Sequence, residues 1–215
     1  SLSLIAITAL ALLGLPIGHS MIAGSILYLA LAGLDMGTAA EQFLNGMYSN
    51  YIILAVPLFI LAGEVMNRGG VTKALIDLSM ALVGRVRGGL GHVNIMTSVF
   101  FAGISGSAVA DAAALSNTLV PAMKERGYTA AYAGAITAAS SIIGPIVPPS
   151  IILIFYGALM QTSVAALFVA GILPGLVLAG ALFAVNAWYA WREDHPRVEK
   201  GDAPPVLPAI WKALP

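Results

Sequence analysis

The chain has 215 residues, of which 59% are hydrophobic and only 9% are charged. Soluble domains carry about 25% charged residues, so this composition indicates a membrane protein rather than one surrounded by water. The ten basic and ten acidic residues cancel, which argues against a nucleic-acid partner, and the lack of cysteine excludes disulfides and thiolate metal sites.

The positions of the charges predict how the chain is threaded through a membrane. The positive-inside rule places basic segments in the cytoplasm, and the stretch that carries only Asp35 and Glu41 is then expected outside, as is the uncharged stretch 161–166. The three basic segments are Arg68 to Arg87, Lys124 to Arg126, and Arg192 to Lys212.

The first part of the chain predicts three short crossings. A crossing helix needs about 20 residues, so residues 1–34 are too long for one crossing and barely long enough for two. The sequence "GLPIG" at 14–18 predicts the break between two short helices, which places the N-terminus outside. Residues 49–66 predict a third crossing that ends in the cytoplasm.

The stretch 69–87 has two chemically different helical faces. Lys73 and Asp77 share one of them. The other is apolar and comprises Val71, Leu75, Leu78 and Leu82. This spacing is typical of an amphipathic helix that lies in the membrane interface; a charged loop is the alternative.

Residues 88–123 are apolar but flanked by basic segments on both sides, so they must begin and end in the cytoplasm. Two full crossings with a turn need more than about 40 residues, so the segment predicts a re-entrant hairpin. The sequence "GISGS" at 103–107 supplies glycines for the turn. We expect Ser107 to cap the second helix and Asp111 to lie near the positive end of its dipole.

A second interruption follows in the apolar run 128–160. The sequence "GPIVPPS" at 144–150 contains three prolines, which lack amide protons and disfavour helix before them. The helix should therefore break near mid-membrane and leave free carbonyls, such as those of Gly144 and Val147. The alternative is a proline kink packed beside a Gly-Ser helix contact.

Two breaks at a similar depth, one rich in hydroxyls and one in free carbonyls, indicate a binding site, because broken helices bind ions and substrates in many secondary transporters. Their oxygen atoms suit a hard cation such as sodium. The following run, 167–191, predicts a crossing back to the cytoplasm, which ends in an interfacial belt of Trp188, Tyr189 and Trp191.

Two other classes of protein compete with a transporter. "GISG" matches the GxSG around the nucleophile of rhomboid-type intramembrane proteases, but that chemistry needs a general base, and no histidine lies between Ser107 and Asp194. His19, His92 and His195 are expected near the interfaces instead. A passive structural subunit is the other alternative, although it does not explain two breaks at one depth.

Five segments in this order resemble the large membrane subunit of TRAP transporters, the tripartite ATP-independent periplasmic uptake systems, in its DctM type. They are "VPLFILAGEVMNRGG" (56–70), "RVRGGLGHVNIMTSVFFAGISGSAVADAAAL" (85–115), "LVPAMKERGY" (119–128), "IIGPIVPPSIILIFYG" (142–157) and "ALFVAGILPGL" (166–176).

The resemblance implies a bacterial inner-membrane permease, not an enzyme, which has no organic cofactor and couples the uptake of an organic anion to sodium. Substrates of the family include C4-dicarboxylates, sialic acid and other carboxylates. A periplasmic binding protein delivers the substrate, and a small four-helix membrane subunit accompanies the large one. The implied fold is an all-α inverted repeat of the elevator type, with one re-entrant hairpin and one broken helix in each half.

This sequence contains one hairpin and one broken helix, so we expect it to be the N-terminal half of such a subunit, as a fragment, a split subunit or a truncated product. The expected regions are scaffold-like helices with the interfacial helix in 1–87, a transport region in 88–160, a crossing in 167–191 and a cytoplasmic linker to the second half in 192–215. Within the transport region, the hairpin covers 88–126 and the broken helix 128–160.

The resemblance also implies site residues. The substrate would approach Ser107, Asp111 and Ser150. One sodium ion would lie between the hairpin tip and the helix break, near Ser105, Gly106, Ser107, Gly144, Pro145, Val147 and Pro148.

Overall fold

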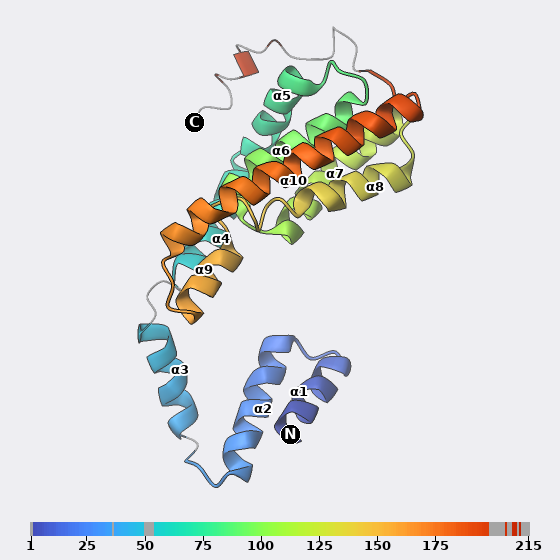
Figure 1. Ribbon diagram of the computed structural model, residues 1–215. Coiled ribbons are helices and arrows are strands. Elements are labelled where there is room, and N and C mark those ends of the chain that lie inside the picture. Colours follow the sequence, from blue (N-terminus) through green and yellow to red (C-terminus); the bar gives the residue numbers. More distant parts are fainter. Residues whose placement is uncertain are drawn as a thin grey trace. The chain divides into compact units, whose positions relative to one another are not determined.

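The computed structural model describes residues 2–35, 37–49 and 54–197, together with 205, 208, 209 and 211. The regular structure of these residues is α-helical (Figure 1). The chain divides into two compact units, Ser1–Leu54 and Ala55–Pro215.

The first unit contains three helices: α1 (Leu2–Leu12), α2 (Ile17–Leu31) and α3 (Gly37–Ser49). α1 and α2 confirm the pair of short helices predicted in 1–34. Between them Gly14 has a φ of +94°, a conformation that favours glycine. α3 was not predicted: Glu41 within it and Asp35 just before it indicated only that this stretch is external.

The second unit begins with α4 (Ala55–Arg68) and α5 (Val71–Val83). Part of the crossing predicted at 49–66 lies outside the described residues. α5 confirms a helix in the stretch 69–87, whereas its position in the membrane interface stays a prediction. Of the predicted apolar face, Leu75 is buried. Leu82 is 47% exposed, whereas Ile76 is buried in a cluster with Val93, Leu115 and Leu119. The helix is therefore oriented by its neighbours α6 and α7.

The predicted hairpin is present as α6 (Gly89–Ser105) and α7 (Ala108–Glu125). The turn at Gly106 and Ser107 falls within "GISGS", as expected. Ser107 is the N-cap of α7, where its hydroxyl accepts a hydrogen bond from the Ala110 amide at 3.4 Å. We refer to residues 105–107 as the tip.

The predicted broken helix is present as α8 (Ala130–Ser141) and α9 (Ile151–Leu159). The stretch between them, 142–150, is named the break below. α10 (Val164–Arg192) follows, and it alone among the described helices is both long and apolar enough to cross a membrane. Figure 1 shows α10 running along α6 and α8 in the second unit. The core cluster beneath it includes Leu90, Met123, Ile136 and Ala179.

The end of α10 is attached to the base of the hairpin. Arg87 pairs with Asp194, and the Tyr128 hydroxyl donates to the Pro196 carbonyl at 3.2 Å. These contacts join the ends of three segments that the charge pattern places on one side of the membrane. The side itself stays a prediction.

Candidate functional site: the hairpin tip and the helix break

The tip and the break are in direct contact. Gly106 has a φ of +57°, and a Cβ atom at this position would lie 2.6 Å from the carbonyl oxygen of Pro149 and 3.1 Å from the amide nitrogen of Ile151. Only glycine fits such a turn without strain or a shift of backbone. The tip thereby joins the break, 43 residues further along the chain.

The two serines of the tip have different partners. The Ser105 hydroxyl accepts a hydrogen bond from the Ser107 amide at 3.1 Å and donates to Oδ1 of Asp111. The Ser107 hydroxyl accepts from the first turn of α7. Both side chains supply oxygen atoms at the point where α6 ends and α7 begins.

Asp111 lies behind the tip, fully buried at 0% exposure. While its Oδ1 atom accepts from Ser105, its Oδ2 atom has no hydrogen-bond partner among the described residues. A Cβ atom on Gly144 would lie 2.5 Å from that oxygen, so the carboxyl group faces the backbone of the break. An isolated carboxylate is costly in such surroundings, and a cation nearby would lower the cost.

The break has an internal hydrogen bond of its own. Ser150 caps α9, accepting from the Leu153 amide at 3.3 Å, and its hydroxyl donates to the Pro145 carbonyl at 2.6 Å. The carbonyls of Gly144 and Val147 accept none of the loop hydrogen bonds in the described residues. These are the carbonyls that the prolines were expected to free.

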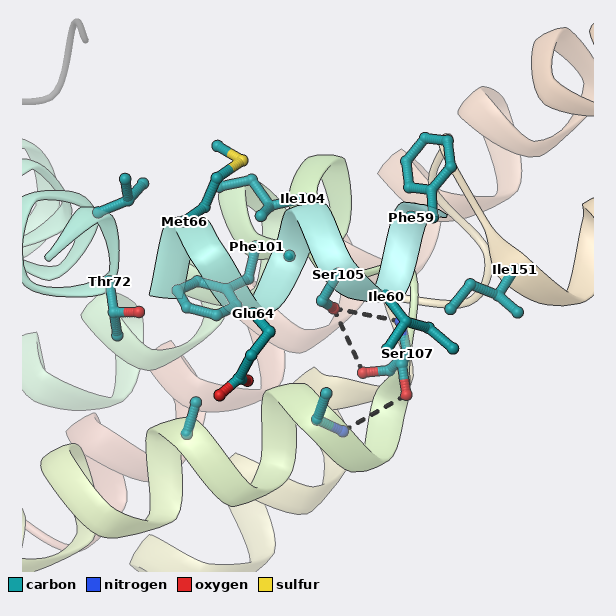
Figure 2. Close-up of a pocket in the computed structure, with 14 residues that line it drawn as sticks. Phe59, Ile60, Glu64, Met66, Thr72, Phe101, Ile104, Ser105, Ser107 and Ile151 are labelled. Carbon is teal, nitrogen blue, oxygen red and sulfur yellow. Dashed lines mark hydrogen bonds between the residues drawn. The ribbon is translucent and has the colours of Figure 1, made fainter. Parts of the chain in front are cut away.

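A cavity of about 250 Å³ lies beside the tip, between α4 and the hairpin. Figure 2 shows Ser105 and Ser107 on its wall, with Glu64 and Thr72 further along. Glu64 pairs with Arg68 on the same helix at 2.7 Å. The other lining residues are apolar or small: Phe59, Ile60, Gly63, Met66, Val71, Phe101, Ile104, Ala110, Ala114 and Ile151.

The structure places some of the predicted site residues on the cavity wall and others away from it. Ser105 and Ser107 line the cavity, whereas Asp111 and Ser150 are fully buried and do not. Of the break, Gly144 adjoins Asp111, and the Pro149–Ser150 backbone adjoins the tip. The side chain of Val147 packs against α10, since a Cβ on Gly175 would lie 2.3 Å from its Cγ2 atom.

Sequence reasoning missed a group of buried polar side chains between α6 and α8. The hydroxyls and amide of this group are hydrogen-bonded across the two helices. The sequence pattern that could have revealed this group is the spacing of its polar residues, four apart on α6 and three apart on α8. The members are Asn94, Ser98, Thr137 and Ser140.

The helical fold of the described residues and the apolar composition fit a membrane protein, and comparison with known proteins identifies its family. The family model described as "Tripartite ATP-independent periplasmic transporter, DctM component" matches residues 4–215. The chain therefore belongs to the DctM family of TRAP transporter permeases.

Several similar proteins are named transporter permeases. The chain is 43% identical to the sialic acid TRAP transporter large permease protein SiaM of Vibrio cholerae, over 87% of this chain and 44% of that protein. It is 42% identical to the sialic acid TRAP transporter permease protein SiaT of Haemophilus influenzae, over 87% of this chain and 30% of that protein. For the 2,3-diketo-L-gulonate TRAP transporter large permease protein YiaN of Escherichia coli, the identity is 41% over 94% of this chain and 47% of that protein. The chain thus matches less than half the length of each.

Proposed function

We propose that this chain forms the first half of the large permease subunit in a sodium-coupled system that takes up an organic anion. Family membership supports a permease. The contact between Gly106 and the Pro149 carbonyl supports a binding site formed by the tip and the break. It unites two interruptions of helical structure, which is the arrangement that secondary transporters use to bind ions and substrate.

The proposed sodium site lies between the tip and the break. Hydroxyl and carbonyl oxygens are the ligands that hard cations prefer, and the described residues contain no cluster of three or more His, Cys, Asp or Glu side chains. The orphan oxygen of Asp111 adds one negative charge close by. The ligands would come from Ser105, Gly106, Ser107, Gly144, Pro145, Val147 and Pro148.

The proposed substrate is a carboxylate, in the class of C4-dicarboxylates or sialic acid. Two of the relatives are named for sialic acid and one for 2,3-diketo-L-gulonate, all of which are organic acids. The cavity adjoins the first turn of α7, where Ala110 is part of the wall, and helix N-termini favour anions. Ser107 would contact the substrate, while Asp111 and Ser150 would shape the site from behind.

The proposed assembly follows the family. A periplasmic binding protein would deliver the substrate, and a small four-helix membrane subunit, the second half of the large subunit and membrane lipid would surround this chain. The location would be the bacterial inner membrane, with the N-terminus periplasmic and the tail after α10 cytoplasmic. Movement would be of the elevator type within an inverted-repeat fold.

Ser105→Ala and Ser107→Ala test the sodium site in the complete transporter reconstituted in liposomes. Each removes a hydroxyl oxygen from the tip, so we expect the sodium concentration that half-saturates carboxylate uptake to rise about three- to tenfold, the effect of one lost polar contact. The measurement is the initial uptake rate against sodium concentration.

Ser163→Ala is the matched control. Ser163 also caps a helix, accepting from the Ala166 amide at 3.3 Å, but it belongs to the loop before α10. Its loss should leave the sodium dependence unchanged. Uptake that does not depend on sodium in the unmodified transporter would contradict the proposed function.

Cysteine labelling tests the proposed orientation. Arg85, Lys124, Gln161 and Arg192 are all exposed, and the chain has no native cysteine. An impermeant thiol reagent added outside intact cells should modify Gln161→Cys only, because the other three positions lie in or beside basic segments. Permeabilised cells control for reactivity. External labelling of Lys124→Cys would contradict the re-entrant hairpin.

A further inference from the structure

A chain of hydrogen bonds connects α6 and α8 within the core. The Ser98 hydroxyl donates to the Ser140 hydroxyl at 2.9 Å, which in turn donates to Oδ1 of Asn94 at 2.9 Å. The Asn94 amide then donates to the Thr137 hydroxyl at 2.7 Å, and that hydroxyl donates to the Ala133 carbonyl at 2.8 Å. We call Asn94, Ser98, Thr137 and Ser140 the ladder.

All four side chains of the ladder are hydrogen-bonded to one another and shielded from solvent. The Ser140 hydroxyl also lies 3.2 Å from the Thr137 carbonyl on its own helix, and the last acceptor of the chain is the Ala133 carbonyl of α8. All four side chains are at most 1% exposed. A partly satisfied network in such surroundings would be costly, whereas a complete one specifies a single arrangement.

Directional bonds have a particular value between helices in lipid. Apolar contacts alone discriminate poorly between helix registers there, because lipid tails are as apolar as leucine, and hydroxyl and amide groups contribute to the association. A slip of α8 along α6 would separate Asn94 from Thr137 and Ser98 from Ser140 together. The ladder therefore sets the register of the two helices.

This register determines the geometry of the proposed site. α6 ends at the tip, seven residues after Ser98. α8 leads into the break, in which Gly144 comes four residues after Ser140. The ladder positions increase together along both helices, so they run in the same direction. Any displacement between them passes directly to the contacts of Gly106 with Pro149 and of Asp111 with Gly144.

We propose that Asn94, Ser98, Thr137 and Ser140 are positioning residues, which hold the tip and the break at the separation that sodium binding requires. The proposal rests on the proposed function, since it concerns the same site. The ladder itself does not touch the ion. It makes the hairpin and the first part of the broken helix move as one body.

Thr137→Val and Ser140→Ala test the ladder in the complete transporter. Valine keeps the shape of threonine but removes the hydroxyl that accepts from Asn94. We expect both variants to raise the half-saturating sodium concentration about three- to tenfold, the range that interhelical hydrogen bonds in membranes allow. Thr137→Ser keeps the hydroxyl and should retain wild-type sodium dependence.

Thr97→Val is the matched control on α6. Thr97 is also fully buried, but its hydroxyl has no partner among the described residues. This variant should leave the half-saturating sodium concentration unchanged. If Thr137→Val and Ser140→Ala lower thermal stability but not the apparent affinity for sodium, the ladder is only stabilising and the inference is wrong.

A distance measurement tests the role of the ladder without measuring sodium-dependent uptake. Spin labels at Gly103→Cys and Ile142→Cys report on the ends of α6 and α8, at exposed positions. The distribution of their separations should broaden in Thr137→Val and stay narrow in Thr97→Val; equal widths would overturn the inference. Uptake without sodium dependence would contradict the proposed function instead, and the distances would still decide the role of the ladder.

Discussion

Gly106→Ala should reduce sodium-dependent uptake by at least tenfold, although it adds a single methyl group. The left-handed conformation of this residue costs a non-glycine side chain about 1–2 kcal/mol. The added Cβ would also lie 2.6 Å from the Pro149 carbonyl, which is backbone and has no rotamer with which to move aside. The tip must therefore withdraw from the break. Initial uptake rates at matched expression would measure the effect.

Gly103→Ala controls for the loss of a glycine. Gly103 lies in the last turn of α6, three residues before Gly106, and no atom approaches its potential Cβ position within 4 Å. It should tolerate alanine with wild-type uptake. If Gly106→Ala also transports at the wild-type rate and with the wild-type sodium dependence, contact between the tip and the break is not required for transport.

Asp111→Asn should raise the half-saturating sodium concentration by more than tenfold while leaving the protein at least as stable. Asparagine preserves the shape and can still accept a hydrogen bond from Ser105, but it removes the negative charge beside the proposed ion. A tenfold change corresponds to about 1.4 kcal/mol. Stability should not fall, because a buried carboxyl group with an orphan oxygen is costly when no cation is bound.

The opposite directions of these two effects distinguish an ion-linked carboxylate from a structural one. Thermal unfolding without sodium measures the stability, and uptake against sodium concentration measures the affinity. Glu125→Gln on the same helix, at an exposed position, controls for the loss of one charge and should change neither quantity. Lower stability with unchanged sodium dependence would mean that Asp111 serves only to fold the tip.

The helix interruptions could be predicted from the sequence because they depend on local chemistry. Proline removes amide donors and clashes with the preceding turn wherever it lies, which predicted the break at 144–150. Glycine next to serine predicted both the turn at Gly106 and the cap by Ser107. The position of Asp111 in the first turn of α7 followed from the same cap.

Contacts between distant segments were decided only by the tertiary structure. The periodicity of 69–87 predicted an amphipathic helix, but it did not reveal that Ile76, outside the predicted apolar face, packs with Val93 of α6 and Leu115 of α7. The helix breaks in the sequence did not reveal that Asp111 and Ser150 are fully buried and lie outside the cavity. The ladder between Asn94 and Thr137 joins residues 43 positions apart, and such a pairing depends on how α6 and α8 pack. The sequence by itself therefore determined where the helices break, and packing determined which side chains around the breaks are buried and with which residues they pair.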